Sequence, residues 1–370
     1  MAPSFPRLCA IGLATMLATL LAMMALPHRA YIRWQSEQTE AFARLGWVYE
    51  RIHDDPTPMD IAFIGTSHTL NGVDGLAVAR GLAQAGVRAP DGRCLTVTNL
   101  AIPAYGRNMQ WAVAREVLRA RHPRLLVLEV LENETRTAHP LFYRVAETAD
   151  VLGAPKVVNG NYMADVIRLP WRQLVLWAQS LAPAQFGLKA AWSAADYDGS
   201  TVDNTRIVNV HGQEMTPLRD RVFPASDLRA TAAADMAAKR LHILPPAFDR
   251  WEYALTRRYL TGMLDLADST HTPVLLLYLP AFGRPDQPMD RRWYGGRAMV
   301  GVNDILRRPE LWNDPQHVNA AGAAAISARL GQVLAARLGA KGPHDVAGCA
   351  FGYGPRAVLQ PWRAPYHPAN

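Results

Sequence analysis

Short, mostly apolar runs of strand length recur along this chain, and segments with helical spacing separate them. Such runs are typical of strands that are buried on both faces, and the alternation with helices favours a parallel sheet built from β–α–β units. We therefore predict an α/β fold, a parallel sheet flanked by helices in a three-layer sandwich. The predicted strands are Asp60–Gly65, Cys94–Ala101, Arg124–Val130 and Pro273–Pro280, and the predicted helices are Gly75–Ala85, Asn108–Arg121, Phe248–Ser269 and Ala320–Leu338.

The N-terminal segment from Leu8 to Leu26 carries no charged residue and is long enough to cross a bilayer as a helix. A cleavable signal peptide has a shorter apolar stretch and a small-x-small site, so the sequence favours an uncleaved signal anchor over residues 1–30. Basic residues lie on both sides of the run and do not decide its orientation. Because a short N-terminal tail normally stays inside, we expect the bulk of the chain outside the cytoplasm.

The remainder of the chain divides by composition. Helical spacing from Tyr31 to His53, ended by Pro56 and Pro58, predicts a connecting stalk helix. A long middle region has polar stretches and tryptophans but no strand alternation, which indicates a mainly helical insertion. The expected parts are a stalk helix in 31–58, an α/β domain over 59–340 with its insertion at about 135–245, and a C-terminal tail over 341–370.

Composition argues against several kinds of ligand. The formal net charge is +7, but the basic residues are scattered and no nucleic-acid-binding module is visible, so we expect no nucleic-acid partner. No Cys/His cluster has metal-ligand spacing and no dinucleotide fingerprint is present, so we predict neither a metal nor a cofactor. Cys94 and Cys349 would lie on the same side of a membrane, and both a disulfide and two free thiols are consistent with the sequence.

A candidate nucleophile follows the first predicted strand, where Gly65-Thr66-Ser67-His68 precedes a helix. Catalytic groups of open parallel sheets gather at the carboxyl ends of the strands. The N–H groups at a helix start point towards developing negative charge, while serine itself needs a base to become a good nucleophile. A simple turn with a helix N-cap explains the same residues, so this pattern alone leaves both interpretations open.

A candidate base lies near the end of the chain, where Asp314 precedes His317 by three residues on a predicted turn. In this position the carboxylate accepts the imidazole N–H and holds the tautomer that takes a proton from serine. His68 is a less suitable base, because neighbouring residues on a turn rarely point at each other. A helix-capping aspartate beside a structural histidine is the alternative, and the hypothesis requires a fold that brings His317 to Ser67.

Four segments together resemble the SGNH (GDSL-like) hydrolase superfamily in sequence order and strand placement. The resemblance covers about 60–338, and it implies that Ser67 is the nucleophile, His317 the base and Asp314 its orienting partner. It also implies an oxyanion hole made by the backbone N–H groups of Ser67 and Gly106 and the side-chain amide of Asn133. The four segments are Gly65-Thr66-Ser67, Asn99–Gly106, Leu131–Glu134 and Asp314–His317.

The chain departs from the family pattern at four positions. Thr66 stands where the family has Asp, no Leu follows Ser67, Leu131 stands where the family has Gly, and Glu134 where it has Asp. These departures leave open an oxyanion hole that uses other donors, such as the N–H of His68 or the side chain of Asn108.

The N-terminal anchor with an SGNH-like domain resembles the bacterial proteins that O-acylate cell-envelope polymers. This architecture implies a single-pass protein of the bacterial inner membrane whose catalytic domain faces the periplasm or cell exterior. The implied substrate is an acyl ester or envelope polysaccharide, and an implied partner is a membrane acyl-donor protein. Two alternatives remain open: a non-catalytic, membrane-tethered glycan-binding or assembly protein, and a secreted lipase in which the insertion acts as a lid.

Overall fold

The computed structural model describes residues 4–37, 44–195, 209–210, 213–214, 220–238, 242–342, 346, 348–349 and 351. Its main sheet is entirely parallel, with the strand order β2-β1-β3-β6-β7, which confirms the predicted α/β class. This order reverses direction between β1 and β3, and such a switch point leaves a crevice at the carboxyl ends of those strands. The strands are β1 (Ile61–Ile64), β2 (Val97–Asn99), β3 (Leu125–Val130), β6 (Val274–Tyr278) and β7 (Met299–Gly301).

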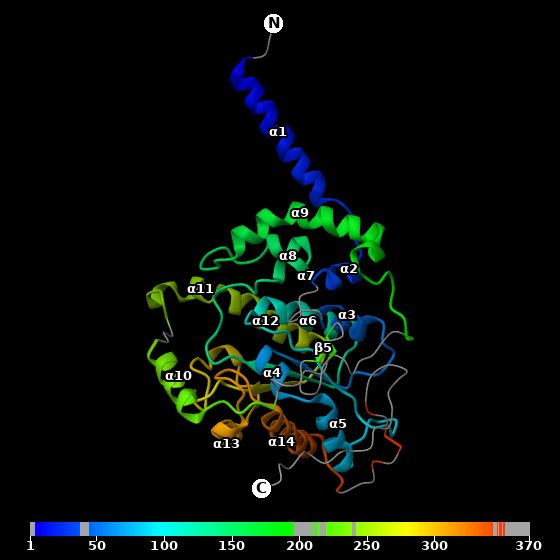
Figure 1. The fold of residues 1–370 in the computed structure, drawn as a ribbon, viewed down its shortest axis with the longest axis vertical. Helices are drawn as coiled ribbons and strands as arrows, with labels where there is room; N and C mark the ends of the chain where they lie inside the picture. The colour runs from blue at the N-terminus through cyan, green and yellow to red at the C-terminus, as the bar shows by residue number, and fades with distance from the viewer. Residues whose placement is uncertain are drawn as a thin grey trace.

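Helices cover both faces of this sheet (Figure 1). Ile61 and Phe63 pack in one apolar cluster with α5 (Gly75–Gln84) and α14 (Ala320–Leu338). Their neighbours Ala62 and Ile64 pack in a second cluster with α3, α6 and α12. Successive strand residues point to opposite faces, so both faces of a mostly apolar strand are buried at once. The second group of helices is α3 (Arg44–His53), α6 (Arg107–Ala120) and α12 (Ala254–Ser269).

The predicted stalk helix was wrong. The described residues of this segment form two helices, α2 (Ala30–Gln35) and α3, and both pack into the domain. Trp34, Leu45 and Ile52 are at most 1% exposed and belong to the apolar cluster on the α6 face of the sheet. A free stalk would leave these large side chains in water, and their burial makes the segment part of the core.

The insertion is mainly helical where the structure describes it, and it joins β3 to α12. Its first helices, α7, α8 and α9, form a further layer on α6 and α12, with Phe142, Leu169 and Tyr259 packed between them (Figure 1). Its elements are α7 (Phe142–Val145), α8 (Thr148–Leu152), α9 (Tyr162–Leu181), η1 (Pro183–Phe186), β4 (Asn209–Val210), β5 (Gln213–Glu214), α10 (Ala225–Ala238), η4 (Pro246–Phe248) and α11 (Asp249–Glu252).

The helix α1 (Phe5–Met24) extends away from this α7–α9 layer and buries none of its side chains (Figure 1). It is long and apolar enough to cross a membrane. The other short elements lie near the carboxyl edge of the sheet or between β6 and α14. They are α4 (Ser67–Gly72), η5 (Arg292–Tyr294), α13 (Asn303–Leu306) and η6 (Pro309–Leu311).

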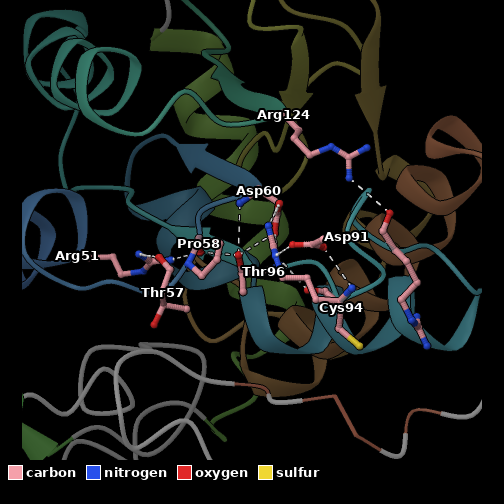
Figure 2. Close-up of polar contacts among 10 residues, drawn as sticks. Arg51, Thr57, Pro58, Asp60, Asp91, Cys94, Thr96 and Arg124 are labelled. Carbon is pink, nitrogen blue, oxygen red and sulfur yellow. Dashed lines mark hydrogen bonds and ion pairs between the residues drawn. The ribbon is translucent and has the colours of Figure 1, made fainter.

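Hydrogen bonds to Asp60 hold the amino end of β1 in place (Figure 2). Arg93 donates two hydrogen bonds to its carboxylate, at 2.6 and 2.8 Å, and the backbone N–H of Thr96 donates a third at 2.8 Å. Burial acts to raise the pKa of Asp60, but these hydrogen bonds outweigh it and hold the pKa below its usual value. The contacts fix β1 beside β2 at the end of the sheet opposite the candidate nucleophile.

A disulfide joins Cys94, just before β2, to Cys349 near the end of the described chain. Their Cα atoms are 5.6 Å apart, and Cys349 packs with Phe351 against the α5–α14 side of the core. The structure thus selects the disulfide from the two alternatives that the sequence left open.

Removal of this disulfide by Cys94→Ser together with Cys349→Ser is expected to lower the free energy of unfolding by about 2–4 kcal/mol, because the cross-link closes a long loop in the unfolded chain. Denaturant unfolding with and without a reducing agent measures this. The wild type should lose stability on reduction and the double variant should not respond. An unchanged wild-type midpoint under reduction would contradict the role of the disulfide.

Candidate active site

Ser67 is the first residue of α4, and Gly65 and Thr66 form the turn that leads to it from β1. The Thr66 hydroxyl caps α4 by accepting a hydrogen bond from the His68 N–H at 3.3 Å. A Cβ at Gly65 would lie 2.2 Å from Glu129 Oε2 and 2.4 Å from Thr69 Oγ1, which no side chain can occupy. The nucleophile turn therefore requires glycine for close approach, as the sequence suggested.

The reason for this close approach is Glu129, a carboxylate on β3 that is 1% exposed. It accepts hydrogen bonds from the backbone N–H and hydroxyl of Thr66, at 2.6 and 2.7 Å, and from those of Thr69, at 3.3 and 2.5 Å. The side chain of Glu129, on the neighbouring strand β3, therefore fixes the turn that carries Ser67. Sequence reasoning missed this residue, although a charged residue inside the buried strand LLVLEV is a signal that such donors exist.

The candidate base is held by a compact turn between η6 and α14. Asp314 Oδ1 accepts the backbone N–H groups of Gln316, at 2.7 Å, and His317, at 2.8 Å. Its other oxygen, Oδ2, lies 2.9 Å from His317 Nδ1. Asn319 caps α14 directly after this turn by accepting the N–H of Gly322 at 2.9 Å. The imidazole is thus fixed both by the carboxylate and by the helix that follows.

His317 reaches Ser67 across 250 residues of chain, with Nε2 lying 2.8 Å from Oγ. A carboxylate only accepts, so Nδ1 carries the ring proton and Nε2 presents its lone pair to the serine hydroxyl. Burial acts to raise the pKa of Asp314, but the hydrogen bonds from His317 and the turn outweigh it and hold the pKa below its usual value. The structure brings Ser67, His317 and Asp314 together in the order that general-base catalysis requires.

His68 faces other partners. Its Nδ1 lies 2.8 Å from the carbonyl oxygen of Leu279, so this nitrogen donates, and Nε2 accepts the hydroxyl of Tyr105 at 3.1 Å. The ring meets His317 edge to face, with centroids 5.8 Å apart. His68 therefore packs beside His317, and both of its ring nitrogens are hydrogen-bonded to other groups.

Gly106 is the N-cap of α6, in the loop after β2. A Cβ there would lie 2.4 Å from the Cβ of His139, so this position too requires glycine. His139 is buried, which lowers its pKa to about 4, and its Nε2 donates to the carbonyl oxygen of Pro103 at 2.7 Å. The same loop touches the nucleophile turn, because Ile102 N–H donates to Gly65 O at 3.1 Å. Sequence reasoning did not identify His139 as the support of this loop.

Asn133 and Asn108, the two side-chain amides weighed as oxyanion donors, lie in different surroundings. Asn133 follows β3, beside the carboxyl ends of the strands, while Asn108 is fully buried in the first turn of α6. Asn108 Oδ1 accepts the backbone N–H of His139 at 3.0 Å, which gives this residue a structural role. Donation from Gly106 and Asn133 to an oxyanion stays a prediction.

The loop after β6 contacts the turn that carries His317. Phe282 N–H donates to the carbonyl oxygen of Pro315, in the turn that carries the triad histidine, at 3.2 Å. Glu132 accepts the N–H of Ala281 at 2.5 Å and pairs with Arg284 at 3.1 Å. A cavity of about 110 Å³ lies against this loop, between it and α13. Ser67, Asp314 and His317 do not line this cavity.

A scan against protein-family models found no match for this chain, and a search of the curated proteins found none. The resemblance to SGNH hydrolases therefore stays a prediction that rests on the residues and their geometry. Among the residues that the structure describes, no group of three or more His, Cys, Asp or Glu side chains is arranged to hold a metal ion.

Replacement of Gly65 by alanine is expected to abolish the activity proposed below or to prevent folding, because the new Cβ would overlap Glu129 and Thr69. Gly72→Ala, at the other end of α4, is the matched control, since its nearest atom would be Leu279 Cδ1 at an ordinary 3.5 Å. Esterase assay and thermal unfolding of both variants measure the difference. Equal behaviour of the two variants would contradict the packing of the nucleophile turn.

Replacement of Asp314 by asparagine is expected to lower the rate of ester cleavage on the order of 10³–10⁴-fold, because the amide no longer stabilises the charged imidazole.

The same replacement is also expected to change the stability of the fold in a way that depends on pH. The folded-state pKa of Asp314 is lowered, so its contribution is present above the usual pKa and is lost as pH falls through the lowered value. The stability gap between wild type and variant, measured by denaturant unfolding, should shrink in acid. A gap that widens in acid would contradict the assignment.

Proposed function

We propose that the protein is a membrane-anchored serine esterase or O-acyltransferase of the SGNH hydrolase type, acting on ester groups of a cell-envelope glycan or polymer. The observation that carries this proposal is the 2.8 Å contact between Ser67 Oγ and His317 Nε2, with Asp314 on the other ring nitrogen. Three residues from opposite ends of the domain have this arrangement at the carboxyl edge of a parallel sheet, where ligands bind.

In the acylation step, Ser67 Oγ attacks the ester carbonyl while its proton moves to His317 Nε2. The imidazolium that forms is stabilised by Asp314, which accepts the Nδ1–H. Collapse of the tetrahedral intermediate breaks the ester C–O bond, and His317 gives the proton to the departing alcohol. The acyl group is then held as an ester of Ser67.

The tetrahedral oxyanion would receive hydrogen bonds from the backbone N–H groups of Ser67 and Gly106 and from the Asn133 amide. One such donor is typically worth about 3–4 kcal/mol of barrier. In the second step, His317 takes a proton from water or from an acceptor hydroxyl, whose oxygen attacks the acyl-enzyme. Water yields an esterase, and a glycan hydroxyl yields an O-acyltransferase.

The environment of the chain supports an envelope substrate. The helix α1 would span a bacterial inner membrane once, with the catalytic domain on the periplasmic or outer side. The Cys94–Cys349 disulfide fits an oxidising compartment, and the net charge of +7 fits an anionic polymer. A membrane protein that delivers the acyl group is the partner that a transferase of this kind would need.

The test is release of p-nitrophenol from p-nitrophenyl acetate by the full chain in detergent. Ser67→Ala and His317→Ala are each expected to lose activity at least on the order of 10³-fold, because the triad acts as a unit. His271→Asn is the matched control: this exposed histidine has a positive φ of 54°, a conformation that asparagine tolerates. Equal turnover by all four proteins would contradict the proposal.

A fluorophosphonate probe separates the remaining outcomes. Labelling of Ser67 in a wild type that does not hydrolyse the acetate ester would support a dedicated transferase that needs its acceptor. Neither labelling nor turnover by folded protein would contradict catalysis and favour a glycan-binding or assembly role. A strong preference for long-chain esters over acetyl esters would favour a lipase.

A further inference from the structure

The outer face of α9 exposes large apolar side chains. Met163, Ile167 and Trp171 follow one another at intervals of four residues and are 64%, 71% and 67% exposed. This spacing places them along one side of the helix. The inner side of α9 packs on the domain, where it buries Leu169 together with polar side chains. The exposed stripe is a second apolar surface of the same helix, and an apolar patch of this kind marks a contact with a protein or a membrane.

The candidate membrane helix leaves the domain at this same helix (Figure 1). Gln173 of α9 donates to the carbonyl oxygen of Leu26, just after α1, at 2.6 Å and contacts His28 Nδ1 at 2.6 Å. The backbone N–H of Arg29 donates to the Ser180 hydroxyl, near the end of α9, at 3.1 Å. The chain is thus fastened to α9 directly after α1, so a bilayer that contains α1 must end next to α9.

The polar residues around α9 also suit a lipid surface. Its only acidic residue, Asp165, is buried, so the outer face carries no negative charge. Exposed basic residues lie on α9 or close to its ends, and tryptophan with nearby cations is typical of helices that lie in the head-group region. These basic residues are Arg168 on α9, Lys156 shortly before it, and Arg29, whose backbone contacts its last turn.

We infer that α9 lies along the membrane surface and that its outer face binds the lipid bilayer which α1 spans. The apolar stripe contacts the head-group and upper acyl region of the bilayer, and the basic residues bind anionic lipid head groups. This inference rests on the membrane insertion of α1 proposed above, but it does not depend on catalysis.

The position of the candidate site follows from the layers. The α7–α9 layer is followed by α6 and α12, and then by the sheet (Figure 1). At about 10 Å for each packed layer, the sheet lies roughly 20 Å from the axis of α9. The carboxyl edge that carries Ser67 lies within the plane of the sheet, so the site opens sideways near the bilayer. In this arrangement α9 holds the domain at the membrane surface, and it does not cover the candidate site.

The test uses the full chain in vesicles of phosphatidylcholine and phosphatidylglycerol, with an environment-sensitive NBD label on single cysteines in a Cys9→Ala background. The native Cys94 and Cys349 are paired and do not react with the label. Label positions are Ile167→Cys on α9, Leu13→Cys on α1, and Ala328→Cys on the exposed side of α14 at the far end of the domain. We expect nitroxide lipids to quench Leu13→Cys from deep positions and Ile167→Cys from shallow ones, and to leave Ala328→Cys unquenched.

Charge substitutions supply the matched control. Met163→Asp with Trp171→Asp should abolish the quenching at Ile167→Cys, because both aspartates would have to enter the lipid. Ala324→Asp with Gln332→Asp has the same spacing on exposed positions of α14 and should leave the quenching at Ile167→Cys unchanged. Quenching at Leu13→Cys with none at Ile167→Cys would overturn the inference while α1 still spans the membrane. Absence of quenching at both would overturn the inference together with the anchor, and the esterase assay is independent of either result.

Discussion

The carboxylate of Glu129 is the group on which the geometry of the site depends. It accepts four hydrogen bonds from Thr66 and Thr69, on either side of Ser67, and so fixes the turn from the adjacent strand. A buried carboxylate is costly without such donors, so the turn and the glutamate stabilise each other. Gly65 leaves room for the Glu129 carboxylate because it has no side chain. Thr66 has two roles, as a hydrogen-bond donor to Glu129 and as the cap of α4.

The remainder of the site depends on β1 and β3 being neighbours. Their parallel pairing brings Glu129 beneath the end of β1, and the strand order opens the crevice at the same point. His317 then needs only one turn, between η6 and α14, to reach Ser67 from the other end of the domain. Because Asp314 both shapes this turn and orients the ring, the position of the base and its tautomer come from one side chain.

Much of this arrangement was predictable from the sequence, and the parts that were not have physical reasons. Runs of buried apolar residues marked β1, β3 and β6 closely, and α14 has the predicted bounds. Strand β7 was missed because its three residues, Met299–Gly301, are partly buried or exposed and form no such run. The supposed stalk failed because helical spacing reveals an apolar face but not what covers it, and here the core covers Trp34. Glu129 was missed because its donors come from another strand end.

The insertion between β3 and α12 has two ends with different surroundings. Its α9 end is fastened to the chain after α1, whereas the segment around α10 touches the triad turn: Phe223 N–H donates to the carbonyl oxygen of Trp312 at 2.8 Å. Asp235 of α10 also pairs with Arg284, in the loop beside the cavity, at 3.0 Å. The α10 end of the insertion therefore borders the candidate site. Both ends belong to one continuous segment. If α9 contacts the bilayer as proposed above, the same insertion also borders the candidate site, and the fold sets the distance of that site from the membrane.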